Sequence, residues 1–297
     1  MGAKINRIGR ALTLSVGAFS FLASTPALAA KQPQQLARSS KWLMDYDKDA
    51  CRLAAAFGAD HDSVTVFFSR FEPGDSFFLD VAGERFNLGP VEPKVTVEFG
   101  PGYAPQAFTP TLGANGKTPM LLGLRLDLMG RSESTRTKED PPPLTPDQEA
   151  AVTYVVIRSP GRTPARLELG SMRAPMRAMR ACMDDLVRTW GLDPTVQASL
   201  SRRATPLRSP GEWLRSADYP GPMMFKGNQA LVQFRLEVDE LGAVTNCHIQ
   251  GHTKPEGFAD LTCKLIIKRA KFQPALDAAG KPAKSYYVNR VHWLIPD

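Results

Sequence analysis

Histidine and the short motifs of common catalytic sites are scarce in this chain of 297 residues. It has only four histidines, and their spacing does not match that of zinc ligands. No Cys-x-x-Cys and no Gly-x-Ser-x-Gly occurs, so the usual signals of thiol redox chemistry and of an α/β-hydrolase are missing. Residues 45–49 begin like a calcium loop, but Ala50 stands where glycine is required. We therefore expect no enzyme, no metal and no cofactor.

Long apolar runs are also missing after residue 30, so no later segment predicts a membrane span. Residues 1–30 have the pattern of a secretory signal peptide. Three basic residues precede an apolar run over residues 11–22, and Ala27-Leu28-Ala29 provides a small-x-small cleavage signal. We predict export to the periplasm by a cleavable signal peptide. The alternative is an uncleaved membrane anchor.

The charge excess of the chain is mild once this segment is removed. Cleavage would lower the formal net charge from +7 to +4, because residues 1–30 carry three basic residues and no acidic ones. Such a charge does not indicate a nucleic-acid partner. Arginine is dense over residues 158–180, which we interpret as a solvated face. The length of the mature chain predicts two domains.

All four cysteines lie in the exported part of the chain: Cys51, Cys182, Cys247 and Cys263. An even number of cysteines in an oxidising compartment favours disulfides. Four cysteines allow three pairings, between which the sequence alone does not choose. Proximity favours Cys247–Cys263, which leaves Cys51–Cys182 to close the first domain.

The first domain is predicted over residues 41–192 as a mainly antiparallel β domain with two helices. Turn-forming residues bound its strand-like runs, as in an antiparallel sheet. The expected strands are residues 63–71, 76–81, 94–99, 121–128 and 151–157. A short helix is expected over residues 48–56, a surface loop over 132–146, and a helix over 172–189 whose methionine stripe faces the core. Polar, proline-containing residues 193–211 are the predicted linker.

The second domain is predicted over residues 212–297 as a three-stranded antiparallel sheet packed on a helix, which gives an α+β chain. Residues 231–239 alternate as a strand with one buried side, Gly242 ends a turn, and residues 243–250 return as the hairpin partner. Val244 is out of phase with the return strand, so we expect either a bulge or the turn itself near it. A helix follows over residues 256–270. Its expected apolar stripe is Ala259, Thr262, Cys263, Ile266, Ile267 and Ala270. Cys263 then points at the sheet from which Cys247 would approach.

The closing strand, within residues 285–295, is the candidate binding element. As the last strand of a small sheet it is expected to leave one edge unpaired, and such an edge can accept a guest strand. The candidate residues are Tyr286, Tyr287, Val288, Asn289, Arg290, Val291, His292 and Trp293. The alternative is that the first domain or a dimer partner blocks this edge.

Residues 210–297 contain an ordered series of short motifs: Tyr219-Pro220, Val238, Gly242, Asp260, Phe272, Pro274, Ala275, Gly280 and Pro282. Their order resembles that of the C-terminal domain of TonB-type energy transducers. Two positions depart from the pattern. Gly251-His252-Thr253 replaces the usual Ser-Ser-Gly, and Ala259 stands where leucine is usual.

The resemblance implies a periplasmic module that binds the TonB box of outer-membrane receptors by strand addition, with the contacts on the closing strand. We therefore predict that the protein binds an outer-membrane receptor or another envelope partner, in a role connected with TonB-dependent transport. Two alternatives remain open. One is a membrane-anchored energy transducer, and the other is an envelope scaffold that dimerises through its C-terminal domain.

Overall fold

A computed structural model describes residues 31–88, 94–131 and 142–296 of the chain. The predicted signal peptide and most of the predicted loop at 132–146 lie outside these residues. By its contacts, Gln32–Asp297 forms one compact unit. The chain is α+β with mostly antiparallel sheets and few helices, so the predicted fold class is confirmed. Below, residues 32–192 are called the N-terminal part and residues 193–296 the C-terminal part.

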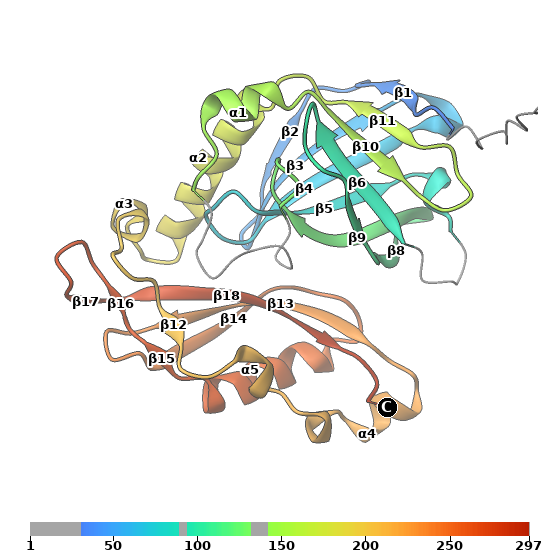
Figure 1. Cartoon of the computed structure of the whole chain (residues 1–297). Helices are drawn as coiled ribbons and strands as arrows, with labels where there is room; N and C mark the ends of the chain where they lie inside the picture. Colours follow the sequence, from blue (N-terminus) through green and yellow to red (C-terminus); the bar gives the residue numbers. More distant parts are fainter. Residues whose placement is uncertain (1–30, 89–93, 132–141, 297) are drawn as a thin grey trace, which may run out of the picture. The chain divides into compact units, whose positions relative to one another are not determined.

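The N-terminal part contains two sheets (Figure 1). The six-stranded sheet has the order β2-β3-β4-β5-β9-β8, with β2 Leu43–Tyr46, β3 Cys51–Phe57, β4 Val64–Arg70, β5 Phe77–Ala82, β9 Thr118–Leu126 and β8 Thr111–Asn115. The five-stranded sheet has the order β1-β11-β10-β6-β7, with β1 Gln34–Ala37, β11 Ala165–Glu168, β10 Tyr154–Arg158, β6 Val95–Gly100 and β7 Gln106–Phe108. Only β1 and β11 pair in parallel among the described strands.

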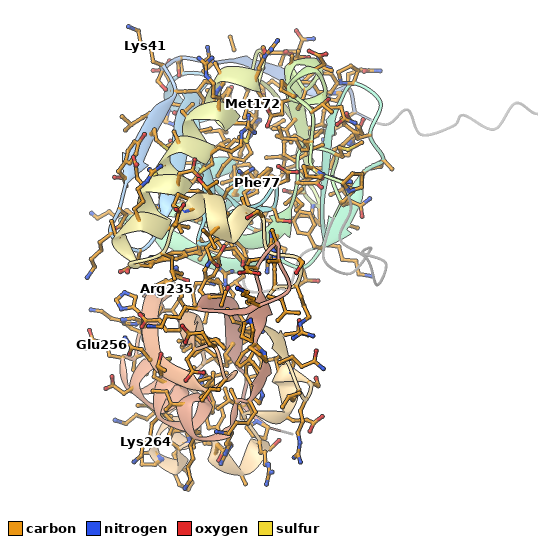
Figure 2. All side chains as sticks on the ribbon, turned by 90° about the vertical axis from the view of Figure 1, so that its left-hand side faces the viewer. Lys41, Phe77, Met172, Arg235, Glu256 and Lys264 are labelled. Carbon is orange, nitrogen blue, oxygen red and sulfur yellow. A yellow bond between two sulfur atoms is a disulfide. The ribbon has the colours of Figure 1, made fainter. Side chains whose placement is uncertain are left out.

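Both sheets and helix α2, Arg173–Thr189, contribute to one hydrophobic core. The strands alternate as expected for a half-buried sheet, so that Val64, Val66 and Phe68 of β4 all point inward. The methionine stripe of α2 is buried in the same core, as its spacing predicts. Figure 2 shows Phe77 and Met172 among these side chains. A second helix, α1 Pro146–Ala151, begins with a capping box at Thr145 and Gln148.

The helix predicted over residues 48–56 is wrong, because this segment contains strand β3. Three consecutive alanines favour a helix locally, but the segment also alternates. Its odd-numbered residues from Cys51 to Phe57 are buried and its even-numbered residues are only half-buried. Strands β2 and β4 pair with its two edges. This tertiary pairing outweighs the helical propensity of the alanines.

The C-terminal part begins with short elements and then forms one antiparallel sheet. The elements are α3 Pro194–Ala198, β12 Thr205–Pro206, α4 Gly221–Phe225, β13 Ala230–Val238, β14 Val244–His252, α5 Gly257–Arg269, β15 Phe272–Gln273, β16 Ala275–Leu276, β17 Pro282–Ala283 and β18 Ser285–Trp293. The main sheet has the order β14-β13-β18, and α5 packs against β13 and β14. A register shift between Glu237 and Val238, where Val238 pairs with Val244, confirms the predicted bulge. The predicted linker at 193–211 contains α3 and β12, and β12 pairs with β15.

Strand β13 differs from the prediction of one buried side. Val232, Phe234 and Leu236 are fully buried on the face toward α5, as expected. On the opposite face, however, Gln233 and Arg235 are also buried. The Arg235 guanidinium lies 4.6 Å from the ring centre of Trp190, which belongs to the N-terminal part. The second face of this sheet is therefore covered as well.

The stripe predicted for α5 is correct except at Ile267. Ala259, Thr262, Ile266 and Ala270 are buried, whereas Ile267 is 41% exposed. Phe258, which was not part of the predicted stripe, is fully buried. The buried positions of this stripe are therefore spaced three or four residues apart, and position 267 lies outside it.

Both preferred disulfide pairings are present. Cys51 of β3 is bonded to Cys182 of α2, and Cys247 of β14 is bonded to Cys263 of α5. Each bridge joins a helix to the sheet on which it packs.

Gly242 is a position where the backbone allows only glycine. Its φ is +78°, and a Cβ there would lie 2.1 Å from the carbonyl oxygen of Phe272. We expect Gly242→Ala to lower the free energy of unfolding by more than the roughly 1–2 kcal/mol of a left-handed alanine, because the clash is with backbone. Gly280→Ala is the matched control, since Gly280 has φ +77° and nothing within 4 Å of its Cβ position. Equal losses in urea denaturation would contradict the clash.

Candidate functional site

Strand β18 lies at one edge of the C-terminal sheet (Figure 1). It pairs with β13 over its whole length, from Ser285 opposite Val238 to Trp293 opposite Ala230, without a register shift. Among the described strands no other one pairs with β18. One edge of β18 is therefore unpaired with any strand in the part of the chain that the structure describes.

The direction of each backbone group on this edge follows from the ladder. In an antiparallel pair, the N–H and C=O of one residue point to the same side, and successive residues alternate. The N–H of Arg290 donates to the Oδ1 of Asn289 at 2.8 Å and so points away from β13. By alternation, Tyr286, Val288 and His292 also direct their N–H and C=O groups outward. These are the groups that a guest strand would pair with.

The side chains of β18 divide between two faces. Tyr287, Val291 and Trp293 pack toward the core under α5, where the Trp293 indole N–H donates to the hydroxyl of Thr262 at 2.9 Å. Asn289 donates to the Tyr287 hydroxyl at 2.9 Å.

The other face of β18 contacts the N-terminal part. The Tyr286 ring lies edge-on to Trp190, and its burial raises the pKa of the Tyr286 hydroxyl. Val288 is buried. The Arg290 guanidinium lies 3.6 Å from the ring centre of Phe78, and burial lowers its pKa to about 10. His292 is exposed. The structure thus places all eight predicted residues on one strand. All their side chains except that of His292 are at least half-buried, and their outward backbone groups have no strand partner among the described residues.

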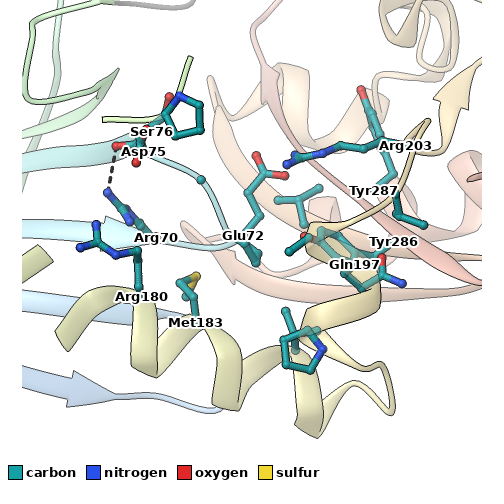
Figure 3. Close-up of a pocket in the computed structure, with 18 of the residues that line it drawn as sticks. Arg70, Glu72, Asp75, Ser76, Arg180, Met183, Gln197, Arg203, Tyr286 and Tyr287 are labelled. Atoms are coloured by element: carbon teal, nitrogen blue, oxygen red, sulfur yellow. Dashed lines mark hydrogen bonds between the residues drawn. The ribbon is translucent and has the colours of Figure 1, made fainter. Parts of the chain in front are cut away.

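A pocket of about 800 Å³ adjoins this edge (Figure 3). Ser285 to Asn289 of β18 form one part of its lining. The rest of the lining comes from the end of β4 and the turn after it, the end of β9 and the residues after it, Pro142 and Pro143, α2, α3 and residues near Arg203. These segments are far apart in the sequence. Their meeting point could not be predicted from local patterns.

Arg70 and Asp127 are the most buried charged groups in this lining, and each is only 2% exposed. One guanidinium nitrogen, Nη2, donates to the backbone carbonyl of Asp75 at 2.9 Å, drawn as the dashed line in Figure 3. The Nε and Nη1 atoms have no hydrogen-bond partner. The pKa of Arg70 is lowered to about 10, mainly by burial and in part by the charge of Arg180. A buried cation with two unsatisfied donors is costly unless something pairs with it.

The other arginines of the pocket are partnered, with one exception. Arg125 pairs with Glu72, Arg131 with Asp127, and Arg180 with Glu149. The exception is the exposed Arg203, whose guanidinium forms no ion pair within the described residues. Asp184 on the exposed side of α2 also lines the pocket. Arg180, the last arginine of the arginine-dense segment 158–180, therefore lines this pocket.

Sequence reasoning missed Arg70, although a signal was present. In β4 the inward positions are Val64, Val66 and Phe68, and the next position in this alternation is Arg70. A charged residue in phase with an apolar face is unusual, because buried charges are rare unless they are paired. Such a residue marks either an internal ion pair or a ligand site.

The site offers outward backbone donors and acceptors, a pocket beside them and a buried guanidinium. Within residues 31–88, 94–131 and 142–296, no cluster of metal-binding side chains occurs. In the same described ranges, none of the helices has the length and apolar character needed to span a bilayer. Comparison of the chain with protein-family models, with curated proteins and with solved structures found no match.

Proposed function

We propose that this protein binds an extended peptide segment of an outer-membrane receptor or another envelope partner by adding it as a strand to β18. The observation that carries the proposal is the nine-residue edge strand whose outward N–H and C=O groups have no strand partner among the described residues. Main-chain hydrogen bonds along such an edge give affinity, and side-chain pockets beside it give selectivity. The pocket next to residues 285–289 provides such a selective element.

The motif order over residues 210–297, similar to that of TonB C-terminal domains, supports the same role. In this proposal the protein is periplasmic and its first 30 residues are a cleaved signal peptide. The two disulfides agree with an oxidising compartment. A mature N-terminus near Ala30 or Lys31, found by N-terminal sequencing, is the expected result. A retained first segment would favour a membrane-anchored transducer.

The variant Val288→Pro tests whether a guest strand pairs with the outward backbone groups of β18. Proline has no N–H, and the N–H of Val288 is directed away from β13, so the internal ladder is kept. We expect the variant to bind a TonB-box peptide about 3- to 10-fold more weakly, which corresponds to one lost hydrogen bond of about 0.5–1.5 kcal/mol. Fluorescence anisotropy with a labelled peptide measures the change.

Val288→Ala is the matched control, because it shortens the same side chain and keeps the N–H. Equal loss of affinity in both variants would show that only the side chain matters and would contradict strand addition. If wild-type protein binds no extended peptide and has the mass of two chains in solution, β18 instead pairs with a second copy.

A further inference from the structure

We infer that the pocket beside β18 selects a guest segment that carries a carboxylate, and that Arg70 is the group that receives it. This inference rests on the proposed strand addition and names the chemistry of the guest. It is carried by the unsatisfied guanidinium of Arg70 in a pocket that adjoins the unpaired edge.

Arg70 lacks the partner that a buried arginine normally has. No described carboxylate forms an ion pair with it, although Arg125, Arg131 and Arg180 each have one. Asp75, whose charge acts on Arg70 from a longer distance, accepts a hydrogen bond from the backbone N–H of Leu144 at 2.7 Å. Nη2 donates to the Asp75 carbonyl and to the Met176 sulfur, so the unused donors are Nε and Nη1, each of which can donate to a carboxylate oxygen.

Position and size make a peptide carboxylate the suitable occupant. The lining joins Arg70 to residues 285–289 of β18, so a strand added to this edge passes the pocket that contains the guanidinium. A volume of about 800 Å³ exceeds what a small inorganic anion needs and accommodates several residues of an extended chain. Arg203 lines the same pocket from the C-terminal part and adds a second positive charge (Figure 3).

The test compares two labelled nine-residue peptides of alternating valine and threonine. One has two central glutamates and the other has glutamines in their place, so the two differ only in charge. We expect the glutamate peptide to bind wild-type protein at least about tenfold more tightly, because charge-assisted hydrogen bonds are about twice as strong as neutral ones. The advantage should shrink in 0.5 M salt to the extent that the site is open to solvent.

Two variants locate the effect. Arg70→Met keeps much of the side-chain volume and should reduce the glutamate advantage to less than about twofold. Because Arg70 is buried, Arg203→Met serves as a second variant at an exposed position, and it should reduce the advantage only in part. Circular dichroism and thermal melting show whether each variant is folded. The comparison of the two peptides on wild-type protein needs no variant.

The outcomes separate this inference from the function on which it rests. If the two peptides bind equally well and Val288→Pro weakens both, carboxylate selection is overturned and strand addition stands. If the glutamate peptide is preferred but Val288→Pro has no effect, strand addition is overturned. A glutamate preference that is unchanged in Arg70→Met overturns the assignment to Arg70. Absence of binding by both peptides overturns both proposals.

Discussion

Replacing Cys51 and Cys182 together by alanine is expected to lower the free energy of unfolding by about 4–5 kcal/mol. The two residues are 131 positions apart, so the bridge removes much conformational entropy from the unfolded chain. Both side chains are buried in the core that the two sheets and α2 share, and the loss of packing adds to the effect. Urea denaturation followed by tryptophan fluorescence measures the change, since Trp42 and Trp190 lie in the N-terminal part.

The matched control is the second bridge. Cys247 and Cys263 are separated by 16 positions, and removing this shorter loop constraint is expected to cost about 3 kcal/mol. Trp213 and Trp293 report on the C-terminal part. A loss for Cys247 and Cys263 as large as that for Cys51 and Cys182 would contradict the dependence on loop length.

Phe234→Ala is the second change with a large expected effect. Phe234 is fully buried at the centre of β13, among Leu236, Ile266 and Phe272. Truncating a buried phenylalanine typically costs about 3–5 kcal/mol, because apolar contacts are lost and a cavity remains. We expect a loss in this range for the C-terminal part.

The matched control is Phe225→Ala, which removes the same side-chain atoms from an exposed position in the C-terminal part. Phe225 in α4 is 94% exposed, so its truncation is expected to change stability by less than about 0.5 kcal/mol. Comparable losses in the two variants would mean that β13 is not the centre of this core. A large effect of Phe225→Ala on peptide binding but not on stability would instead identify a contact surface on α4.

Local periodicity was sufficient for part of the fold, but it did not predict β1, β2, β7, β8 or β11. Strands such as β4 and β13 alternate with period two, and α2 and α5 have a 3.6-residue stripe, so each element could be predicted from its own residues. The same stripe placed Cys263 toward β14 and thereby favoured the correct pairing with Cys247.

Features that depend on distant partners could not be predicted in this way. Strand β3 exists because β2 and β4 flank it, although its alanines favour a helix. Arg235 looks like a solvent-facing residue in the alternation of β13, but Trp190 covers it. For the candidate site, the sequence predicted the edge strand β18 and missed the pocket, because segments far apart in the sequence form its lining.

The two disulfides also determine which segments stay covalently joined after proteolytic cleavage of the backbone. Cys51–Cys182 closes a loop that ends at residue 182, and Cys247–Cys263 opens the next one at residue 247. No crosslink spans the residues between, so one cleavage anywhere from residue 183 to 246 divides the molecule into two polypeptides even under non-reducing conditions. Noncovalent contacts alone, such as those of His248 with Asp49 and of Gln250 with the carbonyl of Phe71, would then hold the fragments together.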